Sequence, residues 1–188
     1  MSRAAIVRYA ACVLAAAALW QFGEALYIAA KAELAQHLIA KAWARAQSGV
    51  VAPKPWPWAD TTPVARLTVY GRQLYVLADA SGRTLAFGPA HLGGTALPGR
   101  GGNTVIAGHR DTHFALLEHV RPGDEIAIEL ADRSLHRYRV SDSAVVHPRD
   151  MRVLAERDHE QVTLLTCFPF RAVAPQAPLR YVVTAIRL

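Results

Sequence analysis

The chain has 188 residues, of which 52% are hydrophobic and 19% are charged, and its formal net charge is +6. This composition excludes a disordered chain, and the length favours one domain with a sizeable core over two domains. The lysine and arginine residues are scattered, without a basic stripe interleaved with aromatics, so the sequence does not favour nucleic-acid binding. The positive charge equally suits a protein that works beside an anionic membrane surface.

The N-terminal stretch predicts a membrane anchor. Residues 4–30 are mostly apolar and rich in alanine, and the middle of this stretch has one polar side chain, Gln21. A spanning helix needs about 20 mostly apolar residues, and the stretch is long enough only if Arg8 or Glu24 extends towards the lipid headgroups. A cleaved signal peptide is the competing interpretation. We favour the uncleaved anchor because the helical pattern continues, free of Gly and Pro, through residues 31–46.

These patterns divide the chain into four segments. Residues 1–30 form a cytoplasmic tail and the transmembrane anchor, residues 31–48 a helical stalk, residues 49–63 a linker with four prolines, and residues 64–188 the folded domain. Prolines at this density exclude a regular helix in the linker. The basic residues on the two sides of the span are nearly balanced, so charge does not fix the orientation. The short N-terminal tail favours a cytoplasmic N-terminus.

The two cysteines do not suggest a disulfide. Cys12 lies inside the hydrophobic segment and Cys167 lies in the folded domain. The two sulfur atoms cannot meet within one chain unless the domain enters the bilayer. Cys167 is therefore expected to be a free thiol, and in an oxidising compartment a lone free thiol needs a function.

The folded domain has the pattern of an all-β protein. Short runs of β-branched and aliphatic residues alternate with turn residues, which predicts a closed barrel or a sandwich of about eight strands. The expected strands are residues 64–70, 74–79, 84–88, 103–109, 125–130, 136–140, 161–167 and 179–188. One short helix is expected over residues 114–120, ended by Pro122 and Gly123.

Two of these strands deliver a reactive side chain at their C-terminal end. One runs through Gly108 to His109, and the other ends at Cys167. A cysteine at its ordinary pKa of about 8.5 is mostly protonated at neutral pH, and a nearby histidine can take the proton and later return one to a leaving amine. A cation or a pair of backbone N–H groups near the developing oxyanion completes this chemistry. Arg180, in the next strand, is the candidate, in preference to Arg171 and Arg187.

Several motifs around these residues resemble those of sortases, the cysteine transpeptidases. T-L-L-T-C, which ends at Cys167, resembles the T-L-x-T-C signature of that family. Other segments also resemble sortase segments and occur in the same order along the chain. Their resemblance is strongest to the class D-type group of proteobacteria. These segments are G-P-A-H-L-G-G-T-A-L-P-G, N-T-V-I-A-G-H-R-D-T-H-F, G-D-E-I, L-T-C-F-P-F and L-R-Y-V-V. The resemblance covers about residues 57–186.

The resemblance implies a fold and a location. The fold is a closed eight-stranded sortase-type β-barrel with one or two short helices, preceded by an N-terminal transmembrane helix. The location is the inner membrane, with a single span and the catalytic domain facing the periplasm. The resemblance implies no cofactor.

The resemblance also implies a reaction. Such an enzyme cuts a substrate protein at a C-terminal sorting signal of LPxTG type, between Thr and Gly. The acyl group forms a thioester with the enzyme's cysteine and is then passed to an amine acceptor. Cys167 is then the nucleophile, His109 the general acid/base, and Arg180 the stabiliser of substrate and oxyanion. Thr166 is expected to shape the substrate groove, and His113 to contact the substrate.

A metal site is a weaker interpretation of the same motif. His109 and His113 have the spacing of two zinc ligands on a helix, but a metalloprotease needs Glu where Arg110 stands. We expect Arg110, Asp111 and His113 to shape the loop instead. A calcium site of the kind found in some sortases would draw on three carboxylates, and nothing in the sequence demands it. These carboxylates are Glu118, Asp124 and Glu125.

Three other functions remain open at this point. The first is another cysteine enzyme acting on peptidoglycan, such as an L,D-transpeptidase. That class would place histidine and glycine just before the cysteine, where this chain has Leu165 and Thr166. The second is a catalytically silent, membrane-tethered binding barrel, which would be indicated by loss of the cysteine, histidine or arginine. The third is hydrolysis of the thioester instead of transfer.

Overall fold

The computed structural model describes residues 2–172 and 177–188, and the chain forms two compact units, Met1–His37 and Leu38–Leu188. Helix α1 (Arg3–Gln47) begins in the first unit and ends in the second. Among the described residues it is the one helix long and apolar enough to cross a membrane, and its apolar part is not buried. A signal sequence passes the same test of length and composition.

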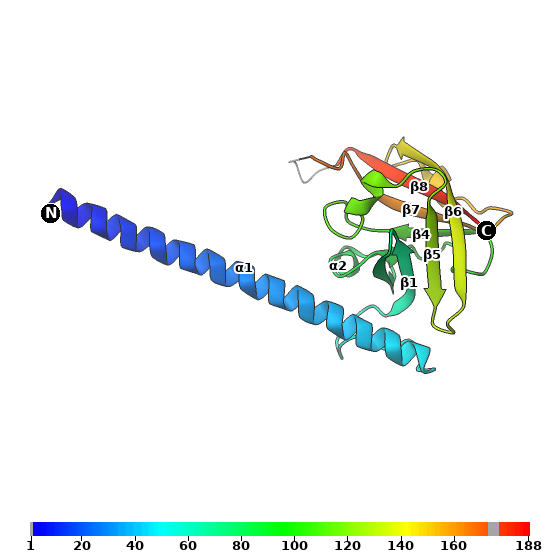
Figure 1. Ribbon diagram of the computed structural model, residues 1–188, viewed down its shortest axis with the longest axis horizontal. Coiled ribbons are helices and arrows are strands. Elements are labelled where there is room, and N and C mark those ends of the chain that lie inside the picture. The colour runs from blue at the N-terminus through cyan, green and yellow to red at the C-terminus, as the bar shows by residue number, and fades with distance from the viewer. Residues whose placement is uncertain (1, 173–176) are drawn as a thin grey trace. The chain divides into compact units, whose positions relative to one another are not determined.

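The second unit contains a closed barrel of eight strands, as the resemblance to sortases implied (Figure 1). Neighbouring strands follow the order β1-β2-β3-β4-β7-β8-β6-β5 around the barrel. The strands are β1 (Pro63–Val69), β2 (Arg72–Ala78), β3 (Ala90–His91), β4 (Asn103–Ala107), β5 (Glu125–Leu130), β6 (Leu135–Val146), β7 (Gln161–Phe168) and β8 (Leu179–Arg187). The pairs β2–β3 and β4–β7 are parallel, and the other pairs are antiparallel.

Alternation of apolar and polar side chains along the strands builds the core. In β1, every second residue is buried, so the strand turns one face to the barrel interior. Each fully buried aliphatic side chain of this kind contributes about 1.5–3 kcal/mol to stability. The largest fully buried members of the core cluster are Tyr138, Phe114, Leu67, Ile106, Leu117, Ile126, Ile128 and Leu164.

Two predicted strands differ from the observed ones. Residues 84–88 are not a strand, because Ser81 caps a short helix, α2 (Gly82–Leu85), by accepting a hydrogen bond from the Thr84 amide at 3.1 Å. Strand β6 runs through Val146, beyond the expected residue 140. The polar run that begins at Ser141 concealed this extension, which pairs with β8 through residues 142–146.

The remaining helical segments are short. The helix expected over residues 114–120 is a 3-10 helix, η1 (Ala115–His119), and a second one, η2 (Met151–Leu154), lies between β6 and β7. Phe114, just before η1, is completely buried.

The last turns of α1 belong to the second unit. Ile39 and Trp43 are buried there, and the Trp43 and Tyr75 ring centroids lie 6.4 Å apart. Gln47 at the helix end donates a 2.7 Å hydrogen bond to Glu129 on β5. In the linker, the Trp56 ring packs edge-on against Phe87 with centroids 5.0 Å apart. The compact unit therefore includes the end of α1 and part of the linker as well as the barrel.

Gly108 should resist substitution, because a Cβ atom there would lie 2.7 Å from the Phe114 ring. We expect Gly108→Ala to destabilise the full chain in detergent by about 1–3 kcal/mol, the usual cost of overpacking a core. Chemical denaturation measures this change. Gly82→Ala is the matched control, since a Cβ there meets nothing within 4 Å. Equal stability of the two variants would contradict the packing described.

Candidate active site

The parallel pair β4–β7 brings His109 and Cys167 to the same end of the barrel. Its register runs from Asn103 opposite Gln161 to Ala107 opposite Leu165. The next residues keep this register, because the Gly108 amide donates to the Leu165 carbonyl at 3.0 Å. His109 and Cys167 then follow on backbones whose spacing in a sheet is about 4.8 Å.

Thr166 fastens these strand ends together. Its hydroxyl donates a 2.7 Å hydrogen bond to the Gly108 carbonyl, and the residue is only 3% exposed. This bond joins the residue before Cys167 to Gly108, the residue before His109. Because Thr166 is buried, its contribution to the site is made through this bond.

Arg180 is directly opposite Cys167 in the antiparallel pair β7–β8. Paired residues on antiparallel strands point to the same face of the sheet, with Cβ atoms about 4.5–5.5 Å apart. Leu164 and Val183 pair on the inner face and belong to the core, so the alternation puts Cys167 and Arg180 on the outer face. Arg180 Nη1 donates to the carbonyls of Ala177 at 3.1 Å and Leu179 at 3.0 Å.

A groove crosses the same outer face. It lies over β6, β7 and β8 and is bordered by the segment between β6 and β7. Its lining includes Val146, Thr163, Val182 and Val153. Val146 is the partner of Arg180 across β6–β8, so the groove reaches the row of strand positions that holds Arg180 and Cys167.

Asn103 holds the border of this groove in place, a role that sequence reasoning missed. Its side-chain amide donates to the carbonyls of Val153 at 3.0 Å and Ala155 at 3.1 Å, and its oxygen accepts from Thr163 at 2.8 Å and Gln161 at 3.1 Å. Asn103 is 1% exposed, and these four bonds satisfy its buried amide. The one signal in the sequence was a polar residue at the head of an otherwise apolar strand.

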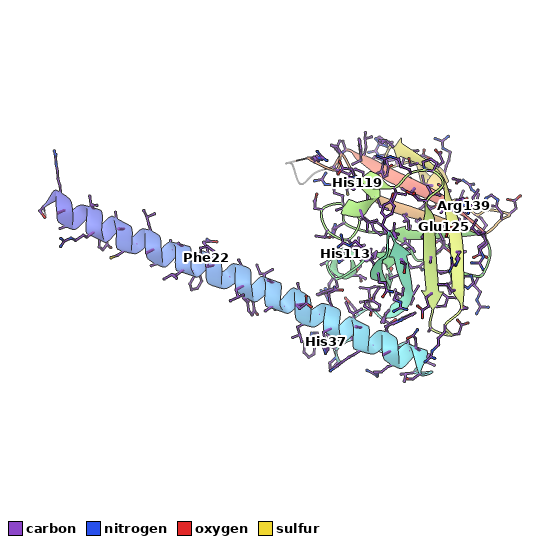
Figure 2. The ribbon with its side chains drawn as sticks, viewed as in Figure 1. Phe22, His37, His113, His119, Glu125 and Arg139 are labelled. Carbon is purple, nitrogen blue, oxygen red and sulfur yellow. The ribbon has the colours of Figure 1, made fainter. Side chains whose placement is uncertain are left out.

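His113 lies near His109, as expected for residues of one loop. Figure 2 shows His113 in the segment that leads from β4 towards η1, and it also labels His119, the last residue of η1. Burial lowers the pKa of His113 below its ordinary value of 6.5, and the charge of His109 lowers this pKa further. His113 therefore favours the neutral imidazole form at neutral pH.

The acidic residues considered for calcium each have another partner. Glu118 pairs with Arg171 at 3.1 Å, and the Arg121 amide donates to Asp124 at 2.7 Å. Glu125 on β5 pairs with Arg139 on the neighbouring strand β6 at 3.2 Å, as can be followed in Figure 2. In residues 2–172 and 177–188, no three or more His, Cys, Asp or Glu side chains are grouped so that they could hold one metal ion.

Comparison with known proteins identifies the family. Residues 66–188 match the sequence model of the sortase domain, which is more than half of the chain. The chain belongs to the sortase family. This finding confirms the resemblance seen in the motifs around Cys167 and agrees with the eight-stranded barrel.

Several sortases are similar in sequence or structure. Sortase D of Bacillus subtilis strain 168 is 26% identical over 117 residues, which are 62% of this chain and 58% of that protein. The sortase D5 transpeptidase of Clostridium perfringens is 27% identical, with a TM-score of 0.60 over 68% of this chain and 79% of that one. Sortase A of Corynebacterium diphtheriae is 33% identical, with a TM-score of 0.62 over 70% and 63% of the two chains.

The lowered pKa of His113 predicts a pH-dependent stability. The unfolded chain binds a proton at this histidine near pH 6.5, whereas the folded chain binds it only at lower pH. Stability should therefore fall as the pH drops below about 6.5, and His113→Gln should remove part of that fall. Denaturation midpoints between pH 5 and 8 measure the slope, with the exposed His119→Gln as matched control. A wild-type slope in His113→Gln would show that the histidine is not held neutral.

Proposed function

We propose that this sortase is a membrane-anchored cysteine transpeptidase that acts on a C-terminal sorting signal of LPxTG type. The observation that carries the proposal is the strand register at one end of the barrel. It puts Cys167 opposite Arg180 and continues towards His109 on the adjacent parallel strand. Nucleophile, proton carrier and cation are the groups that transfer of an acyl group from a peptide to an amine requires.

The first half of the reaction forms a thioester. His109 takes the proton from the Cys167 thiol, and the thiolate attacks the carbonyl carbon of the Thr–Gly bond. Arg180 stabilises the oxygen that becomes negative. His109 then gives the proton to the departing glycine amine, the C–N bond breaks, and the acyl group remains on Cys167.

The second half passes the acyl group to an amine. The neutral acceptor amine attacks the thioester carbon, His109 takes the proton that the new amide must lose, and the C–S bond breaks. The proton returns from His109 to the Cys167 thiolate. Water can enter in place of the amine, in which case the product is a hydrolysed substrate.

Arg180 is suited to the oxyanion role without giving up its present contacts. Both of its hydrogen bonds to described residues use Nη1, which leaves Nε and Nη2 available for the substrate. A guanidinium keeps its charge at any working pH.

Thr166 and His113 support the same site in different ways. We assign to Thr166 an indirect part in shaping the substrate groove, through its bond to Gly108 where the two strands end. A neutral imidazole both donates and accepts hydrogen bonds, so His113 is suited to contact the peptide backbone of the substrate.

The N-terminal region supplies the location. We assign residues 1–30 to a cytoplasmic tail and single membrane span, residues 31–48 to the stalk, residues 49–63 to the linker and residues 64–188 to the catalytic domain. An inner-membrane anchor with the domain in the periplasm fits the apolar part of α1 and a domain whose one cysteine is a free thiol. A class D-type sortase of a proteobacterium accounts for the motifs.

Kinetics of single variants test the proposed roles. Cys167→Ala should abolish cleavage of an LPxTG-type peptide by the full chain in detergent. His109→Ala and Arg180→Ala should each lower kcat/KM by about 10²–10⁴, the range for a general acid/base or an oxyanion donor. Peptide cleavage followed by chromatography measures these losses.

Arg187→Ala is the matched control for Arg180, because it removes an exposed arginine from the same strand. Its rate should stay within about threefold of the wild type, a change below 1 kcal/mol in transition-state stabilisation. A loss below tenfold in His109→Ala or Arg180→Ala would remove that residue from the mechanism. Cleavage by Cys167→Ala would contradict the nucleophile assignment.

A further inference from the structure

Arg110, the residue after His109, is a buried cation with a specific set of partners. Only 5% of it is exposed. Its Nη1 donates to the Pro169 carbonyl at 2.8 Å, and its Nη2 donates to the Ala172 carbonyl at 3.2 Å. Its Nε donates to the Asp111 carboxylate at 2.9 Å.

These partners belong to two different loops. Arg110 and Asp111 lie in the segment that follows His109, whereas Pro169 and Ala172 lie in the segment that follows Cys167. One side chain therefore joins the loop beyond the proton carrier to the loop beyond the nucleophile. Just after β4, Gly108 is bonded to Leu165 and Thr166 of β7, and beyond it Arg110 connects the two loops.

The geometry of a guanidinium explains why arginine stands here. Its planar fork presents donors in several fixed directions, so it can hold two carbonyls and one carboxylate at once. A buried charge is costly unless it is paired and hydrogen-bonded. These hydrogen bonds and the ion pair with Asp111 therefore help to keep this cation buried between the two loops.

We propose that Arg110 is a positioning residue, which sets the separation and orientation of His109 relative to Cys167. This inference rests on the proposed function, because it assigns Arg110 to the alignment of that catalytic pair. Small displacements of reacting groups, of about 1 Å, cost about 10²-fold in rate. The fold itself is held by the core and the strand ladders, so loss of Arg110 should affect alignment more than it affects the barrel.

The test compares Arg110→Met and Arg110→Lys with the wild type, each also in a His109→Ala background. All are full chains in detergent. The kcat and KM of peptide cleavage are measured, and the rate of Cys167 alkylation by iodoacetamide is measured from pH 5 to 10. Alkylation needs no peptide substrate, so it reports on Arg110 even if the proposed function fails.

Arg110→Met should lower kcat by about 10- to 100-fold while KM stays within about threefold. Its alkylation profile should shift towards that of His109→Ala. In the His109→Ala background, Arg110→Met should change neither quantity further, because a residue that acts through His109 has no effect once His109 is gone. Arg110→Lys keeps the charge but not the fork, so it should show a smaller change in the same direction.

Equal losses in kcat with and without His109 would overturn the proposal, and so would a wild-type alkylation profile in both Arg110 variants. If Arg110→Met does not fold, Arg110→Lys with and without His109→Ala tests the proposal instead. A wild-type kcat and a wild-type alkylation profile in Arg110→Lys would show that the planar guanidinium is not needed. The matched control is Arg171→Met, which removes an arginine with an 83% exposed side chain from the same loop. Its exposed ion pair with Glu118 contributes little. Its kcat should stay within about twofold of the wild type. If no variant, the wild type included, cleaves peptide, the proposed function has failed, while the alkylation profiles still decide the role of Arg110.

Discussion

The site depends on one parallel strand pair. Strands β4 and β7 are far apart in sequence, and their register makes the residue after Gly108 and the residue after Thr166 neighbours. Parallel strands need a long connection between them, and here that connection includes η1, β5, β6 and η2. Within this connection, β6 pairs with β8, the strand whose Arg180 lies opposite Cys167.

Buried polar side chains complete what the ladder leaves unsupported. Asn103 attaches the segment before β7 to the barrel, and Arg110 attaches the segment after it. Each is almost fully buried, and each has backbone carbonyls as partners. A buried polar group without partners is costly. Because these two side chains are buried and have partners, they hold the irregular backbone that they contact in one conformation. The segments before and after β7 are thus held by Asn103 on the neighbouring strand β4 and by Arg110 just beyond that strand.

Much of this arrangement could be predicted from local patterns. Alternation of apolar and polar residues identified most strands, and the order of motifs around Cys167 identified the family. The misassigned stretch at residues 84–88 shows the limit, since the Ser81 cap is decided by one side-chain hydrogen bond. The backbone carbonyls that accept hydrogen bonds from Asn103 and Arg110 are about 50 to 60 residues away in the chain, so only the closed barrel reveals them. The catalytic roles of Cys167, His109 and Arg180 stay predictions until they are tested.

The most direct test of the account is whether an acyl group is transferred to Cys167. The full chain in detergent is mixed with peptides that carry LPxTG-type signals, with and without hydroxylamine, and intact-mass spectrometry follows protein and peptide. We expect a peptide-acyl mass on Cys167, its release as a hydroxamate, and neither event in Cys167→Ala. A folded chain with a reactive thiol that forms no adduct with any such peptide would contradict the proposed substrate class. Peptide cleavage in Cys167→Ala would contradict the thioester route itself.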